Sequence, residues 1–197
     1  MSKKIDLELV KKLRDKVDAP IMDCKSALTE AGGDLNKALE ILKRKGIAKG
    51  KEKKQRITSD GLIASYIHFG GKIGVLVEIN CESDFVARTD QFKELVKDIT
   101  MHIAASNPKY ISQEDVPKEV LEKEKSIFKS QFKDKPEAVI EKIMQGKLKS
   151  FFSEVCLLNQ PFVKDPNVTI GEYINLFIGK LGENVRVKRF TRYQLGE

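Results

Sequence analysis

The sequence predicts an α+β protein, in which a small bundle of three helices precedes a core made of a small antiparallel sheet and further helices. Apolar residues recur at helical spacing over the first 46 residues, whereas two later apolar runs have the period of strands. Long helical runs, including an antiparallel helix pair, and a final alternating stretch follow them. We therefore expect an N-terminal three-helix bundle at 1–46, a basic linker at 47–57 and a core domain at 58–197.

The N-terminal bundle is predicted from three short amphipathic runs. Asp34 is placed to cap the third run, and we expect Gly46 to end it. A bundle of this size buries little apolar surface, so some of its apolar residues could serve an interface. Ile21 and Met22 are the candidates, although the same spacing would also suit a place in the bundle core. The expected helices cover 7–17, 21–31 and 35–45.

The core begins with a predicted β-hairpin. Gly70-Gly71 separates two strand-like runs, which is a strong hairpin signal. The last stretch alternates apolar and basic residues, as a strand with one wet face does. Thr89 or Asp90 can cap the helix that follows the hairpin, and Thr169 opens a capping box with Glu172. Strands are expected at 62–69, 72–81 and 185–195, and helices at 90–106, 117–132, 136–155 and 170–181.

The net charge of +7 is concentrated in one short segment. Residues 43–56 hold eight basic side chains against one acidic residue, whereas basic and acidic residues balance in the rest of the chain. A segment of this kind is either a solvated linker or a contact for phosphate or an acidic partner. It contains no aromatic residue, unlike most nucleic-acid-binding surfaces.

Motifs for covalent chemistry are missing from the sequence. There is no G-x-S-x-G elbow, no H-E-x-x-H motif and no C-x-x-C pair, so we expect no catalytic residues, no metal and no cofactor. The three cysteines are expected to be ordinary buried thiols. The charged first residues do not suit a signal peptide, and no apolar run reaches the roughly 18 residues of a membrane span, so we expect a cytoplasmic protein without membrane contact.

An acidic tip that carries one aromatic residue, Asp84-Phe85, is the most informative feature of the sequence. It directly follows the second predicted strand. An exposed Phe forgoes about 1.5 to 3 kcal/mol of burial, so Phe85 either folds back onto its own helix as a staple or is held for a pocket of a partner as a wedge. The spacing of the residues favours the staple.

His102 is one of only two histidines in the chain. Helical spacing places it about 80° from the centre of the apolar stripe of its helix, at about 3.6 residues per turn, and thus at the edge of the buried face. A lone histidine in such a position is usually a structural residue. Two histidines far apart in sequence also do not suit a histidine-rich metal site.

Three separated segments resemble bacterial translation elongation factor Ts over nearly the full chain. The first, residues 9–28, is similar to the N-terminal ubiquitin-associated-type bundle of that family. The second, Ser83-Asp84-Phe85-Val86, resembles the family's Thr-Asp-Phe-Val signature with Ser in place of Thr. The third joins residues 101–106 to 159–163, where Asn159 stands at a position that resembles a glycine in other members, so that we expect a tight turn there.

The resemblance implies a guanine nucleotide exchange factor for elongation factor Tu and not an enzyme. The tip, Ser83 to Val86, would enter the GTPase, displace its magnesium and loosen GDP. The resemblance further implies that the partner is contacted by Ile73, Gly74 and His102, and by Ile21 and Met22 on the bundle. Because the chain has one strand-rich core, it resembles the short type, in which we expect two copies to pair as a homodimer.

Two readings from other classes remain. An RNA- or ribosome-binding module would use the basic linker, and its affinity would fall steeply with salt. A thiol enzyme would use Cys81 as its nucleophile, although a strand cysteine is more often a buried structural residue. On the resemblance we expect no specific nucleic acid partner.

Overall fold

The computed structural model describes residues 6–17, 19–53, 55–130 and 136–197 and confirms the α+β class. The chain forms two compact units, each made of segments that are distant in sequence. Unit 1 contains the described residues of Met1–Leu62, Ile79–Leu95 and Ile174–Arg186, and unit 2 contains those of Ile63–Glu78, Val96–Tyr173 and Val187–Glu197. The division expected at residues 46 and 57 stays a prediction.

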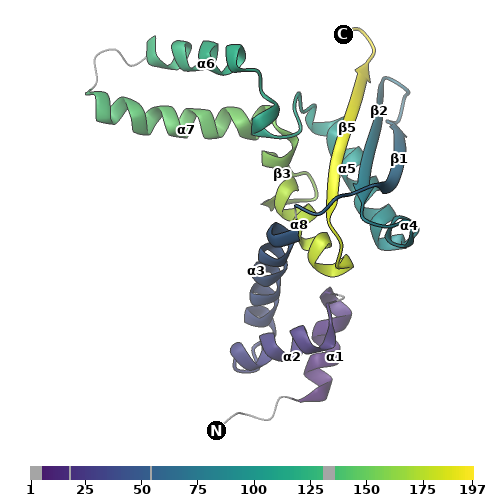
Figure 1. Cartoon of the computed structure of the whole chain (residues 1–197). Helices are drawn as coiled ribbons and strands as arrows, with labels where there is room; N and C mark the ends of the chain where they lie inside the picture. Colours follow the sequence, from purple (N-terminus) through teal and green to yellow (C-terminus); the bar gives the residue numbers. More distant parts are fainter. Residues whose placement is uncertain (1–5, 18, 54, 131–135) are drawn as a thin grey trace. The chain divides into compact units, whose positions relative to one another are not determined.

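Unit 1 begins with a helical bundle (Figure 1). It consists of α1 (Leu7–Val17), α2 (Ile21–Glu30) and α3 (Leu35–Lys53). Asp34 caps α3 as expected, since its carboxylate accepts from the backbone N–H groups of Asn36 and Lys37 at 2.9 and 3.1 Å. The core of the bundle is formed by Val10, Leu13, Cys24, Ala27, Leu28, Ala38 and Leu42.

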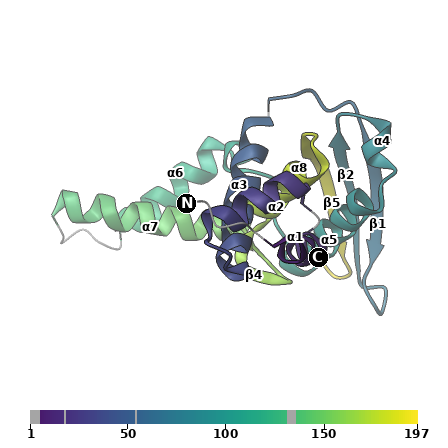
Figure 2. The ribbon, with the colours of Figure 1, turned by 90° about the horizontal axis from the view of Figure 1, so that it is seen from below.

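The expected end of α3 at Gly46 is wrong, because the helix continues to Lys53. Residues 47–53 of the predicted basic linker are therefore helical. At Gly46, α3 instead lies close to α8 (Ile170–Leu181) in unit 1 (Figure 2). A Cβ atom added to Gly179 of α8 would lie 3.1 Å from the Cα atom and the carbonyl oxygen of Gly46, so Gly179 leaves no room for a side chain at this crossing.

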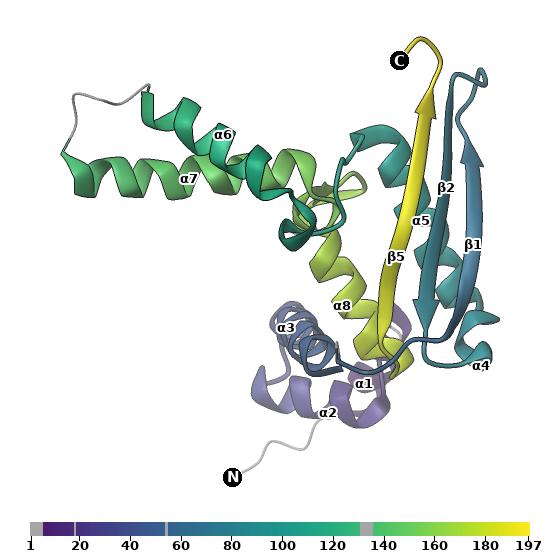
Figure 3. The same ribbon diagram turned by 45° about the horizontal axis from the view of Figure 1, so that its top comes forward.

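The strands β1 (Asp60–Ile67), β2 (Ile73–Cys81) and β5 (Val185–Gln194) form a sheet in the order β1-β2-β5 (Figure 3). The predicted hairpin is confirmed, with Gly70 and Gly71 at φ 89° and 70° in its turn. Buried side chains alternate with half-buried or exposed ones along β2, so one face of this strand points to the core. The chain leaves β2 at Cys81 and enters the single helical turn α4 (Asp84–Ala87).

Helix α5 (Asp90–Ser106) is capped by Thr89, whose hydroxyl accepts from the N–H of Phe92 at 3.2 Å. In unit 2, α6 (Lys118–Ser130) and α7 (Glu137–Val155) form the expected antiparallel pair (Figure 1). The capping box at Thr169 is also confirmed: the Glu172 carboxylate accepts from the Thr169 N–H at 2.9 Å.

Unit 2 also contains a small hairpin that the sequence did not predict, formed by β3 (Pro161–Phe162) and β4 (Asp165–Thr169). Asn159 lies in the 3₁₀ turn Leu157–Asn159 that precedes it. The tight turn expected at Asn159 is therefore present, but without positive φ: within the described ranges, the non-glycine residue with positive φ is Asn107, at 45°. A 3₁₀ turn uses ordinary right-handed dihedrals, so this position does not require glycine.

Candidate partner-binding site

The Asp84-Phe85 tip is an exposed single-turn helix. Ser83 has extended backbone dihedrals and caps α4, with its hydroxyl accepting from the Val86 N–H at 3.4 Å. Phe85 is 84% exposed and Val86 is half-buried. Since a staple would bury the ring against its own helix, the staple reading of Phe85 is wrong. The fold leaves this aromatic ring in solvent, which costs burial energy unless a partner covers it.

Asp84 pairs with Arg88 one helical turn later, at 2.9 Å between Oδ2 and Nη2. Both side chains are exposed, so solvent screens the pair and it contributes at most about 1 kcal/mol. Asp84 can therefore exchange this partner for another cation at small cost.

The base of the tip is held by two carboxylates. The Glu183 carboxylate accepts from the Ser83 hydroxyl at 2.6 Å and from the Ser83 N–H at 3.0 Å. The Glu82 carboxylate accepts from the N–H of Asn184 at 2.6 Å and lies 3.6 Å from Arg56. The sequence analysis missed Glu183, because it lies 100 residues from Ser83 and belongs to no motif.

His102 is fully buried in unit 2, so its expected place at the edge of the buried face is wrong. Its Nδ1 accepts from the Val163 N–H at 3.4 Å, which assigns the ring proton to Nε2, 3.0 Å from the Gln160 Oε1. Residues 160–163 cover the ring, and this cover cannot be inferred from the periodicity of one helix. Burial lowers the pKa of His102, and the hydrogen bond with Gln160 opposes that shift in part.

The other two residues implied to face a partner from the core, Ile73 and Gly74, are half-buried at the start of β2. A Cβ atom added to Gly74 would lie 3.1 Å from the Ile67 Cδ1, so a side chain at position 74 would crowd β1. The structure brings Ile73, Gly74 and His102 into unit 2, and the tip into unit 1.

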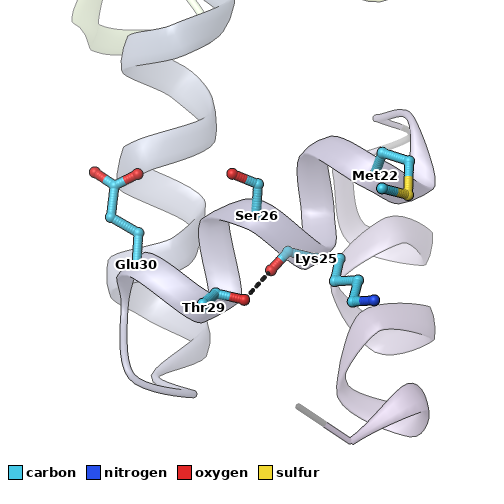
Figure 4. Close-up of a pocket in the computed structure, with 5 residues that line it drawn as sticks. All are labelled: Met22, Lys25, Ser26, Thr29 and Glu30. Carbon is cyan, nitrogen blue, oxygen red and sulfur yellow. Dashed lines mark hydrogen bonds between the residues drawn. The ribbon is translucent and has the colours of Figure 1, made fainter. Parts of the chain in front are cut away.

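Ile21 and Met22 lie at the start of α2 and are 53% and 71% exposed. The alternative that they fill the bundle core is wrong. Met22 also borders a pocket along α2 (Figure 4). Its lining consists of Met22, Lys25, Ser26, Thr29 and Glu30.

Several basic side chains of residues 43–56 have partners within the chain. Arg44 and Lys45 pair with Glu30 at 3.6 and 2.7 Å. Lys53 donates to the carbonyl of Gly182 at 2.7 Å, at the end of α8. These contacts give these three side chains a structural use within unit 1.

The cysteines are buried, as expected. Burial, with the nearby Glu183 carboxylate as a smaller cause, raises the pKa of Cys81 to about 11. A thiol with this pKa is almost entirely protonated at neutral pH, which argues against Cys81 as a nucleophile. Across residues 6–17, 19–53, 55–130 and 136–197, no three His, Cys, Asp or Glu side chains are grouped so that they could hold a metal ion. No helix within these residues is long and apolar enough to cross a membrane.

An exposed aromatic on an acidic tip and an exposed apolar pair on a small helical bundle are typical of a factor that works by binding another protein. Comparison with known proteins gives the family. Residues 9–197 match the family model described as "Elongation factor TS".

Similar proteins cover nearly the whole chain. Elongation factor Ts of Koribacter versatilis is 59% identical over 190 residues, which are 95% of this chain and 87% of that protein. Elongation factor Ts of Fervidobacterium nodosum is 56% identical over 195 residues, 98% of this chain and 99% of that protein. The protein of Thermotoga petrophila is 53% identical over 193 residues, 98% and 97% of the two chains. The chain therefore belongs to the elongation factor Ts family, a family of translation elongation factors.

Proposed function

We propose that this chain is a guanine nucleotide exchange factor for elongation factor Tu, acting in the cytoplasm, and that the Asp84-Phe85 tip carries out the exchange step. The membership in the elongation factor Ts family supports the role. The observation that carries the mechanism is the 84% exposure of Phe85 on a helical turn whose base is held in place.

Phe85 supplies the binding energy of the tip. Burial of its ring in a pocket of the GTPase would recover about 1.5 to 3 kcal/mol that the free chain forgoes. Ser83 and Val86 flank Asp84-Phe85 in the sequence and fix the start of α4 through the cap between them.

Asp84 supplies the charge. A carboxylate brought next to the nucleotide site competes with the ligands of magnesium and repels the diphosphate. The exposed ion pair between Asp84 and Arg88 breaks at a small cost in free energy when the tip enters the nucleotide site.

Exchange requires that the factor bind the empty GTPase better than the loaded one. A nucleotide with nanomolar Kd is held by about 12 kcal/mol, and the tip lowers this only by the free energy it gains in the empty state. The coupling is reciprocal, so nucleotide and magnesium expel the factor in turn.

The remaining contacts position the factor on its partner. Ile21 and Met22, beside the pocket of α2, would dock the bundle on the nucleotide-binding domain of the GTPase. Ile73, Gly74 and His102 would support a second contact from unit 2. Because His102 is buried, we expect it to act there by holding the Val163 backbone in place.

We further propose that two copies of the chain pair as a homodimer, with the tip supplied by one copy and the His102 region by the other. Large apolar side chains exposed on the strands of unit 2 support this proposal, since such a surface is usually covered. They are Ile63, Ile67, Leu76 and Tyr193. Sedimentation of the purified chain should give a dimer that Leu76→Arg dissociates and Ile57→Arg does not; a fully active monomer would refute the pairing.

The exchange function is tested by the release of labelled GDP from elongation factor Tu. Loss of the ring in Phe85→Ala should slow release by about 10- to 100-fold, the equivalent of its burial energy. Asp84→Ala should also slow release, because the competition with magnesium is lost. Ile57→Ala, which truncates an apolar side chain that is 88% exposed, is the matched control and should retain the full rate. No acceleration by the unaltered chain would refute the proposed function.

A further inference from the structure

Two Glu-containing dipeptides hold each other at the base of the tip. Glu82-Ser83 follows the end of β2, and Glu183-Asn184 precedes the start of β5. Glu183 accepts the N–H of Ser83 at 3.0 Å, and Glu82 accepts the N–H of Asn184 at 2.6 Å. Each carboxylate thus binds the backbone N–H of the residue that follows the other carboxylate, and we name this arrangement the reciprocal clamp.

The clamp lies where the sheet ladder stops. β2 and β5 are neighbouring antiparallel strands, so the end of one meets the start of the other. Beyond Cys81 and before Val185 the chain leaves the ladder, and its N–H groups need other acceptors. The two carboxylates supply them, and hydrogen bonds to a charged acceptor are stronger than those to a neutral one.

Glu183 does more than satisfy one N–H group. Its second oxygen accepts the hydroxyl proton of Ser83 at 2.6 Å. This bond orients the lone pairs of the same hydroxyl toward the Val86 N–H, which is the cap of α4. A helix of four residues has too few internal hydrogen bonds to be stable by itself, so its direction depends on this anchor.

We propose that Glu183 is a positioning residue for the exchange step, which holds Ser83 so that α4 presents Phe85 at a fixed angle. This inference rests on the proposed function. Both hydrogen bonds that Glu183 makes in the clamp go to Ser83 and none goes to Phe85 or Asp84, so Glu183 acts on the tip through Ser83.

A positioning role has consequences that differ from those of a general loss of stability. The tip acts after docking, whereas Ile21 and Met22 provide the docking contacts. Loss of Glu183 should therefore lower the maximal rate of GDP release and leave the half-saturating concentration of the factor nearly unchanged. A merely destabilised protein would instead lose active concentration and unfold at lower temperature.

The experiment measures release of labelled GDP from elongation factor Tu against factor concentration, for the full chain and its variants. Glu183→Ala should lower the maximal rate about tenfold, which corresponds to about 1.4 kcal/mol in the barrier to release. Glu183→Gln, which retains an acceptor but not the charge, should lie between Glu183→Ala and the unaltered chain. Glu40→Ala removes an exposed acid elsewhere in unit 1 and should behave like the unaltered chain.

Variants at Ser83 test whether the two residues act as one unit. Ser83→Ala, which removes the hydroxyl, should lower the maximal rate. Combined with Glu183→Ala, Ser83→Ala should cause little additional loss, since the two residues share one interaction. Fully additive losses would overturn the proposal.

A second measurement separates this inference from the proposed function. Amide hydrogen exchange of Val86 and Arg88 in the free chain reports on α4 without any partner, and Glu183→Ala should speed it by about tenfold. If the unaltered chain fails to speed GDP release from elongation factor Tu, but Glu183→Ala does speed amide exchange in α4, the proposed function is refuted and the anchoring of the tip by Glu183 is supported. If the chain is active and Glu183→Ala changes neither the maximal rate nor the amide exchange by twofold, the role of Glu183 is overturned.

Discussion

Lowering the pH should destabilise unit 2 through His102. The ring is fully buried, its Nδ1 accepts from the Val163 N–H, and its Nε2 donates to Gln160. A second proton on the ring would have to sit on Nδ1, facing the Val163 N–H. The side-chain amide of Gln160 is fixed with its oxygen toward Nε2, because its nitrogen donates to the carbonyls of Ser106 and Glu154 at 3.3 and 2.7 Å. It therefore offers no acceptor to a proton on Nδ1.

The sign and size of the effect follow from the lowered pKa. In the unfolded chain His102 takes up its proton near the ordinary pKa of 6.5, whereas in the folded chain burial delays protonation to lower pH. Between these two values the unfolded state binds more protons, so the free energy of unfolding falls as the pH falls. At pH 5.5 the loss reaches up to about 1.4 kcal/mol, and above the ordinary pKa it disappears.

Tyrosine fluorescence is a suited probe, because the chain has no Trp and its four Tyr residues all belong to unit 2. Urea unfolding at pH 8, 7, 6 and 5.5 gives the free energy of unfolding for the unaltered chain and for His102→Gln. The variant cannot titrate, and its packing losses do not depend on pH. The stability advantage of the unaltered chain over the variant should therefore shrink by up to about 1.4 kcal/mol between pH 8 and pH 5.5.

A difference between the two proteins that stays constant with pH, within about 0.3 kcal/mol, would refute this account of His102. His68→Gln is the comparison variant. His68 is exposed and hydrogen-bonded to the Tyr66 hydroxyl at 3.0 Å, and it is the only other histidine in the chain.

Further predictions concern backbone, thiols and charge. Gly61→Ala should destabilise the chain by about 3 kcal/mol in urea unfolding, because φ is 148° and the new Cβ would collide with the backbone of β2. Gly146→Ala, where the new Cβ would lie in open space on α7, should instead stabilise the chain by about 0.5 to 1 kcal/mol. Iodoacetamide at pH 8 should leave the buried Cys81 unmodified in the folded chain and modify it after unfolding, as mass spectrometry would record. Arg88→Gln should speed GDP release by about twofold, since Asp84 no longer has to leave an ion pair; a slower release would show that Arg88 assists the tip.

Local signals predicted most of the secondary structure. The Asp34 cap, the Gly70-Gly71 turn and the Thr169 capping box each depend on residues within about four positions, and each is present as expected. The prediction at Gly46 was wrong for a physical reason: a glycine after a helical run resembles a C-cap, but this glycine lies inside α3, where Gly179 of α8 packs against its backbone. A close approach of two helices depends on residues more than 100 positions apart.

The same limit applies to the site. The tip itself could be found in the sequence, since an aromatic next to an acid at the end of an apolar run is a local pattern. Its anchor could not, because nothing in Glu183-Asn184 indicates that two strand ends meet there. The surroundings of His102 likewise come from residues 160–163, which contain the two-residue strand β3, too short to leave a period-2 pattern.

Whether Phe85 packs on its own helix or stays exposed depends on the length of that helix. Helical spacing favoured the staple, because a ring on a helical turn usually finds apolar neighbours on the same helix. Helix α4, however, is four residues long, and its buried residue is Ala87, so it offers no apolar face on which Phe85 could pack. The length of the turn is set by the cap at Ser83 and by the new helix that Thr89 caps. An anchored turn this short has no place for the ring except solvent, and the exposure that a partner can use follows from the two caps.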